Sequence, residues 1–145
     1  MNENNELLVH IYKTSEMGVL STKQLLSTLK KKENKIKDVV SFELKKYEEF
    51  YKLSKKILNK QNITPKGNGI ITKISSDMGI KMETIMDNSD AAIASMLIEG
   101  FTIGVTEMKI KIDLYNGVCD RKTIKLAKDL LKYQEGEIEK LKAFM

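Results

Sequence analysis

The sequence predicts an all-α protein, a four-helix bundle made of two antiparallel hairpins, and three observations support this. The chain of 145 residues has one proline, Pro65, and no glycine-rich or serine-rich segment, so long stretches are free to be helical. Apolar residues recur along these stretches at spacings of three and four, the period of a helix with one buried face. The connections are short, then about 30 residues long, then short, and short turns join antiparallel neighbours.

The first two helices are expected over residues 3–31 and 34–60, separated by a turn at 32–34 with Asn34 as the N-cap of the second helix. Small residues near the middle of the first stripe allow a neighbour to come close. Glu43 is the one charged member of the second stripe. The first stripe comprises Leu8, Ile11, Ser15, Gly18, Thr22, Leu25 and Leu29, and the second comprises Ile36, Val40, Glu43, Tyr47, Phe50, Ser54 and Ile57.

A strong helix breaker at residues 61–68 ends the second helix, because Pro65 lacks an amide hydrogen and Gly67 admits positive φ. A shorter amphipathic helix is expected over 70–86, kinked at Gly79. The third long helix, 89–115, begins in the capping cluster 87–90 and is closed by Asn116 and Gly117. Asp120 is expected to cap the fourth helix, 120–144. The apolar stripe of the short helix comprises Ile70, Ile71, Ile74, Met78, Met82 and Ile85.

The long connection allows the chain to cross the bundle before the third helix begins, so the two hairpins are joined by one crossover that contains the short extra helix. An internal repeat supports two copies of a helical hairpin. The shift that lays Gly18 on Gly104 also lays Tyr47 on Tyr133. It therefore matches the first helix to the third and the second to the fourth, within a single domain that spans 1–145.

Several helix-packing residues carry a resemblance to a known group of proteins: the segment 17–19 (Met-Gly-Val), the segment 88–94 (Asn-Ser-Asp-Ala-Ala-Ile-Ala), Gly100 and Gly104. Over residues from about 7 to 144 the chain resembles a family of small, uncharacterised bacterial ferritin-like proteins of the domain-of-unknown-function kind. The resemblance implies a ferritin-like bundle. It carries over no active-site residue, because its motifs are packing residues.

Charge and composition favour a cytoplasmic protein without a dedicated nucleic-acid site. The formal charge is +5, and Arg121 is the one arginine among 25 basic residues, whereas base and phosphate recognition favours arginine. Cys119 is the one cysteine, which excludes an internal disulfide and fits a reducing compartment. Residues 1–6 are polar and acidic, unlike a signal peptide. The apolar run 91–106 is broken by Glu99 and too short for a membrane span, so a core helix is expected.

Metal chemistry of the usual ferritin-like kind is not expected, because a two-metal centre needs a Glu-x-x-His motif on each of two helices and His10 is the one histidine. The residues three positions after Glu43, Glu99, Glu107 and Glu135 cannot replace the histidine. They are Lys46, Thr102, Ile110 and Ile138. A carboxylate-only site for Mn²⁺, Mg²⁺, Ca²⁺ or Fe is the alternative. If such carboxylates converge without a partner, at least one should have a raised pKa. The candidates are Glu43, Glu99, Glu107, Glu135 and Glu137, with Glu16 beside the first stripe.

The expected role is therefore a non-catalytic one, as a structural or self-associating interaction module, because no catalytic or phosphate-binding signature is present. No cofactor is expected. Residues 69–86 are expected either to cover the bundle or to form a homodimer contact, because their Ile and Met stripe needs cover. The alternatives are the carboxylate-only metal protein and a weak electrostatic binder of nucleic acid or anionic surfaces.

Overall fold

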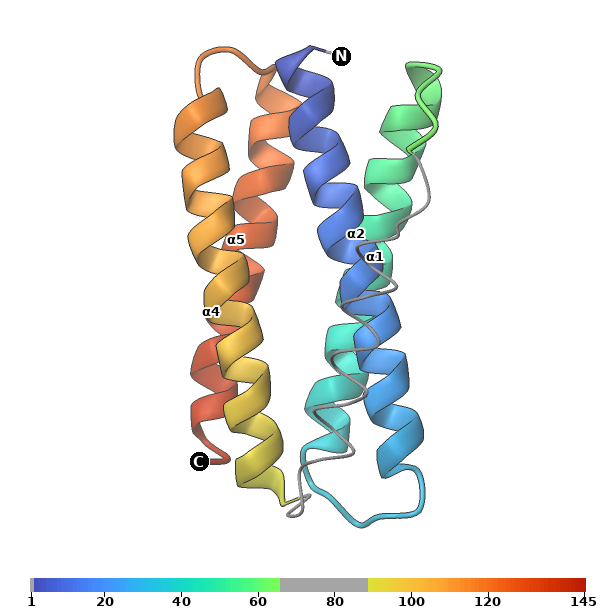
Figure 1. The fold of residues 1–145 in the computed structure, drawn as a ribbon, viewed down its shortest axis with the longest axis vertical. Helices are drawn as coiled ribbons and strands as arrows, with labels where there is room; N and C mark the ends of the chain where they lie inside the picture. Colours follow the sequence, from blue (N-terminus) through green and yellow to red (C-terminus); the bar gives the residue numbers. More distant parts are fainter. Residues whose placement is uncertain (1, 66–88) are drawn as a thin grey trace.

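The computed structural model describes residues 2–65 and 89–145, which form four α-helices (Figure 1). The prediction of an all-α four-helix bundle of two hairpins is confirmed. The expected short helix at 70–86, with its kink at Gly79, lies outside the described residues. The helices are α1 (Glu3–Leu29), α2 (Lys37–Lys60), α4 (Asp90–Tyr115) and α5 (Arg121–Lys142).

The two hairpins are α1 with α2 and α4 with α5, and each hairpin joins its helices through a short connection. Figure 1 shows that α2 ends at the opposite end of the bundle from the start of α4, so α2 and α4 run in the same direction. This parallel arrangement of α2 and α4 is the one that a crossover connection between two hairpins requires.

Three of the predicted helix ends have the expected caps. The Ser89 side chain accepts a hydrogen bond from the Ala92 amide at 3.2 Å, and Asp120 accepts one from Thr123 at 2.8 Å. These bonds satisfy amides that have no partner within the helix. Gly117 follows α4 with φ of +85°, a conformation that favours glycine.

The prediction that Asn34 caps α2 is wrong. The helix begins at Lys37, and its N-cap, Ile36, makes no side-chain cap bond. Asp90, the first residue of α4, takes over this role: its carboxylate accepts bonds from the amides of Lys35 at 3.2 Å and Ile36 at 3.4 Å, and from the Asn34 side chain at 2.9 Å. Helix α1 likewise ends at Leu29, two residues earlier than predicted.

Polar contacts also join the hairpins at the other end of the bundle. The Tyr115 hydroxyl donates to Glu6 at 2.8 Å, and the Asp120 amide donates to Asn4 at 3.0 Å. The start of α1 is thereby fixed beside the end of α4 and the start of α5.

The core follows the predicted stripes. All seven members of the α1 stripe are buried. On α2, Phe50 and Ile57 are half-buried, and Leu58 is buried in place of Ile57. Two apolar clusters, one toward each end of the bundle, draw residues from all four helices. The four described helices thus share one interior.

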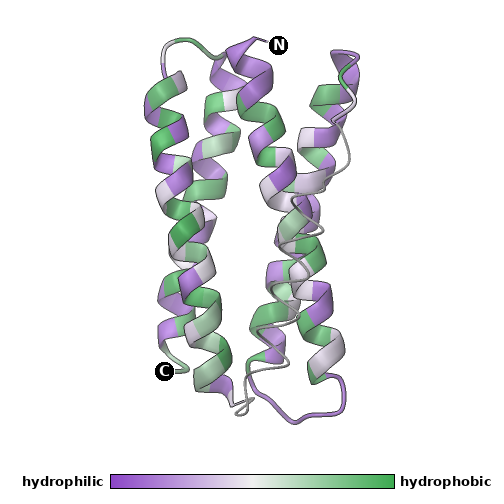
Figure 2. Ribbon diagram, in the orientation of Figure 1, coloured by the Kyte–Doolittle hydropathy of each residue, from purple (hydrophilic) through white to green (hydrophobic). Residues whose placement is uncertain are grey.

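Helix α4 is apolar along most of its length (Figure 2). By length and composition alone it would be able to cross a membrane, a criterion that the core helix of a soluble bundle also meets, and 28% of its most apolar window is buried. One face, including Ile93, Leu97 and Phe101, packs in the core as expected. The opposite face leaves Ile103, Ile110 and Leu114 56–62% exposed.

Candidate functional site

The structure brings together two of the five candidate carboxylates, Glu43 of α2 and Glu137 of α5. Both are buried, with 0% and 1% of their surface exposed. Glu99, Glu107 and Glu135 are exposed, and Glu135 forms a surface ion pair with Lys109 at 3.8 Å. Of the five candidate carboxylates, this pair alone is therefore buried, and the other three lie on the surface.

Helical periodicity places both carboxyl groups in the core. Glu43 lies between Val40 and Tyr47 in the buried stripe of α2. Glu137 lies between Gln134 and Leu141 in the corresponding stripe of α5. Since spacings of three and four keep residues on one helix face, both glutamates must enter the interior when α2 and α5 pack.

Among the described residues, the pair has one cationic partner. The Lys140 ammonium lies 3.0 Å from Oε1 of Glu137 and 3.8 Å from the centre of the Phe42 ring. In the part of the chain that the structure describes, neither oxygen of Glu43 accepts a hydrogen bond. Oε2 of Glu137 accepts none either. Buried acceptors without donors are costly, so these oxygens need a further proton, water or cation.

A shared proton meets this need. Burial, reinforced by the charge of Glu137 and a hydrogen bond between the two side chains, raises the pKa of Glu43 to about 9, and Lys140 opposes the shift. A pKa of about 9 keeps Glu43 protonated at neutral pH, and its proton makes it the member of the pair that is able to donate a hydrogen bond. This is the direction expected for carboxyl groups that converge in the interior, and a titration of Glu43 tests it.

Aromatic rings lie near the pair. The Tyr47 ring lies 5.5 Å from Tyr133 in an edge contact and 6.0 Å from Phe101 in a stacked one. Burial, followed by the carboxyl charges, raises the pKa of both phenols above the usual tyrosine range. The phenols consequently stay neutral beside Glu43 and Glu137.

Gln134 is a polar member of the site that the sequence analysis missed. Its side chain is 2% exposed and packs against Gly104 of α4, where an added Cβ would lie 2.7 Å from its nitrogen. Its oxygen lacks a donor among the described residues. The spacing of Leu130, Gln134 and Glu137 was the available signal, because it marks the buried face of α5.

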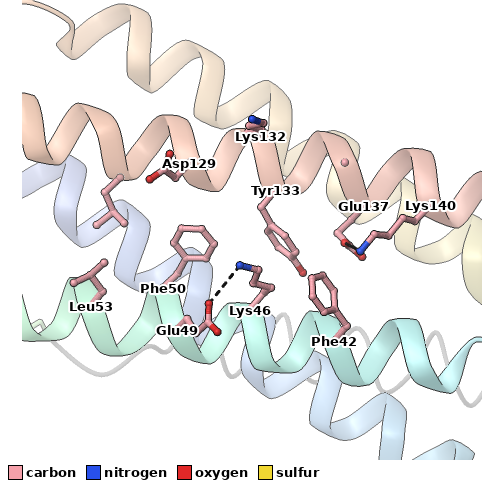
Figure 3. A pocket seen from close by; sticks show the side chains of 12 residues that line it. Phe42, Lys46, Glu49, Phe50, Leu53, Asp129, Lys132, Tyr133, Glu137 and Lys140 are labelled. Carbon is pink, nitrogen blue, oxygen red and sulfur yellow. Dashed lines mark hydrogen bonds and ion pairs between the residues drawn. The ribbon is translucent and has the colours of Figure 1, made fainter.

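A groove of about 500 Å³ between α2 and α5 has Glu137 in its lining (Figure 3). In this view the Lys140 and Glu137 side chains meet at one side of the groove, close to Phe42. Phe42 and Leu53 are 38% and 47% exposed, so the apolar lining faces solvent. Lys46 and Glu49 form an ion pair at 3.4 Å on the α2 rim.

Metal ligands are sparse around the pair. No group of three or more His, Cys, Asp or Glu side chains that could hold a metal occurs among residues 2–65 and 89–145. His10 is half-buried on α1, where burial and the nearby Lys111 lower the pKa of its imidazole to about 4. The arrangement at Glu43 and Glu137 is suited to holding a proton between two buried carboxyl groups. Comparisons with protein-family models, curated proteins and solved structures found no match to this chain.

Proposed function

We propose that this chain is a ferritin-like, non-catalytic helical bundle that acts as a structural or interaction module by associating with a second copy of itself. The observation that supports this proposal is the apolar outer face of α4. The crossing from α2 to α4 supports the ferritin-like topology.

The outer face of α4 has the spacing of a helix-packing surface. Ile103, Ile110 and Leu114 are separated by seven and four residues, so they lie on one side of the helix, and each is more than half exposed. Gly100 lies on the same side and has open space beside it. Contiguous apolar surface of this kind marks interaction sites in soluble proteins.

Charge complementarity favours a second copy as the occupant of this face. In an antiparallel pair of α4 helices centred near residue 109, residues at equal distances from the centre lie opposite each other. Glu107 then lies beside the partner's Lys111, and Ile103 lies close to the partner's Leu114. Two-fold dimers with such self-complementary surfaces are the commonest oligomers.

The expected contact through residues 69–86 lies outside the described residues and stays a prediction. If that segment of the same chain covered α4, the protein would be a monomer. The oligomeric state therefore separates the two arrangements.

Light scattering coupled to size exclusion tests the proposal. We expect a dimer in the native chain and a monomer after Ile110→Lys, because a buried lysine at the centre of the contact would lack a partner. Glu107→Lys or Lys111→Glu alone should weaken the dimer at least about tenfold, and the double exchange should restore it. Leu20→Lys, at an exposed position of α1, is the matched control. A native monomer would refute the proposal.

The orphaned oxygens of Glu43, Glu137 and Gln134 favour one competing function, a carboxylate-only metal protein for Mn²⁺, Mg²⁺, Ca²⁺ or Fe. Lys140 counts against it, because an ammonium ion already neutralises Glu137. Elemental analysis of protein purified without chelator tests this alternative, which requires a stoichiometric metal that Glu43→Gln removes.

A further inference from the structure

We infer that Glu43, Glu137 and Lys140 form a proton-dependent latch that holds α2 against α5, and that loss of one proton opens the groove between these helices. The inference is independent of self-association, because the latch lies inside the bundle and the proposed dimer contact lies on the outer face of α4.

The first support for the latch is the shortage of hydrogen-bond donors around the carboxyl groups of Glu43 and Glu137. Two ionised carboxylates offer only acceptors to each other, and neither Glu43 oxygen has another donor in the described part of the chain. A single proton between them converts this repulsion into a charge-assisted hydrogen bond, which is among the strong hydrogen bonds of proteins. The bond crosses from α2 to α5 and so joins the two hairpins.

The second support for the latch is charge balance. With one proton, the pair carries a single negative charge, which the Lys140 ammonium neutralises at 3.0 Å. Without that proton, the pair carries one negative charge more than Lys140 neutralises. Burial of an uncompensated charge is strongly unfavourable. Separation of α2 and α5, which admits water, is the available relief.

Within residues 2–65 and 89–145, the neighbouring groups do not supply another cation. On α2 and α5 the titratable groups that face the pair are Tyr47, Tyr133 and Lys140. From the other two helices, Gly18 of α1 lies against Tyr47, and Phe101 of α4 stacks on the ring of Tyr47. Neither of these residues titrates.

The third support for the latch is the position of Lys140, which indicates where the groove between α2 and α5 would open. Lys140 spans the groove from α5 to Phe42 on α2, while its ammonium binds Glu137 (Figure 3). The same side chain thus links the pair to the opposite wall of the groove. When the pair loses its proton and the helices separate, this cation–π contact is lost with it.

Spin labels on the two walls test opening directly. With Cys119→Ser as background, cysteines replace Glu49 on α2 and Lys132 on α5, both exposed on the groove rims. We expect the measured distance to increase between pH 7 and pH 10, and to stay constant in Glu43→Gln, whose amide donates to Glu137 at every pH. An unchanged distance in the labelled native sequence, or an equal increase in the variant, would overturn the latch.

Unfolding in urea supplies a second measurement. The pKa of Glu43 in the folded chain lies above its ordinary value of 4.5, so its contribution to stability is fully present below about pH 4.5 and is lost as the pH rises through about 9. Between pH 6 and pH 10 the unfolding constant of the native chain should rise at least about 100-fold more than that of Glu43→Gln. Glu49→Gln, on an exposed part of α2, should behave like the native chain. Equal pH dependence in all three proteins would also contradict the latch.

Discussion

At the scale of single residues, Gly18 and Gly104, which the internal repeat relates, each leave room for a side chain of the neighbouring helix. A Cβ on Gly18 would overlap the ring of Tyr47, and one on Gly104 would contact Gln134. The sequence predicted that small residues in the α1 stripe allow a close neighbour. The neighbour is a side chain from the second helix of the hairpin, which periodicity alone does not reveal because a stripe identifies a face and not its contacts.

We predict that Gly18→Ala destabilises the bundle by about 1–3 kcal/mol, because the ring of Tyr47 is held by other aromatic rings and overpacking forces side chains off their rotamers. This cost exceeds the gain of about 1 kcal/mol that alanine brings to a helix interior. Urea unfolding of the native chain and of Gly18→Ala measures the net change in the free energy of unfolding.

Gly136→Ala is the matched control, since open space surrounds that position within α5, and it should stabilise the protein by about 0.5–1 kcal/mol. If the two variants were equally stable, the close packing of Gly18 against Tyr47 would be excluded.

At the scale of helices, local patterns were sufficient for the bodies of the four described helices and for the caps at Ser89 and Asp120. They failed at the start of α2. The capping carboxylate there belongs to Asp90, which is 56 residues from Asn34 in the sequence. Sequence patterns describe neighbours within a few residues, whereas this cap depends on how the hairpins assemble.

We predict that Asp90→Ala destabilises the bundle by about 1–2 kcal/mol, because the amides of Lys35 and Ile36 lose their acceptor. Hydrogen exchange of those two amides should become faster. Asp113→Ala, at an exposed site on the same helix, should leave their exchange unchanged. Unaltered exchange in Asp90→Ala would show that the hairpins are not joined by this contact.

At the scale of the whole molecule, the candidate site could be predicted only in part. Glu43 stood out as the charged member of an apolar stripe, and its pKa is raised first by burial and then by the charge of a second carboxyl group. Which carboxyl group it meets depends on the packing of α2 against α5. Glu137 and Glu135 are equivalent as candidates in the sequence, yet the first is buried and the second is on the surface.

The charge of the whole molecule also decides how it meets polyanions. Four lysines and Asn59 line an open depression of about 450 Å³ near the end of α2, and no carboxylate is among the described residues of its lining. Lysines of this kind contact phosphates without reading sequence, and the described lining has no aromatic residue to stack a base. The weak electrostatic binding considered from the sequence would therefore be centred on Lys52, Lys55, Lys56 and Lys60.

We predict that affinity for duplex DNA falls steeply with salt and is independent of DNA sequence, because release of counterions supplies its free energy. Fluorescence anisotropy at increasing KCl should show a log–log slope that decreases by about 1 for each of Lys52→Gln and Lys56→Gln. Lys142→Gln should change it less, because Lys142 already pairs with Glu139 at 2.8 Å. Binding that survives at about 200 mM salt and discriminates between sequences would instead require a recognition surface with base contacts, which lysines alone do not provide.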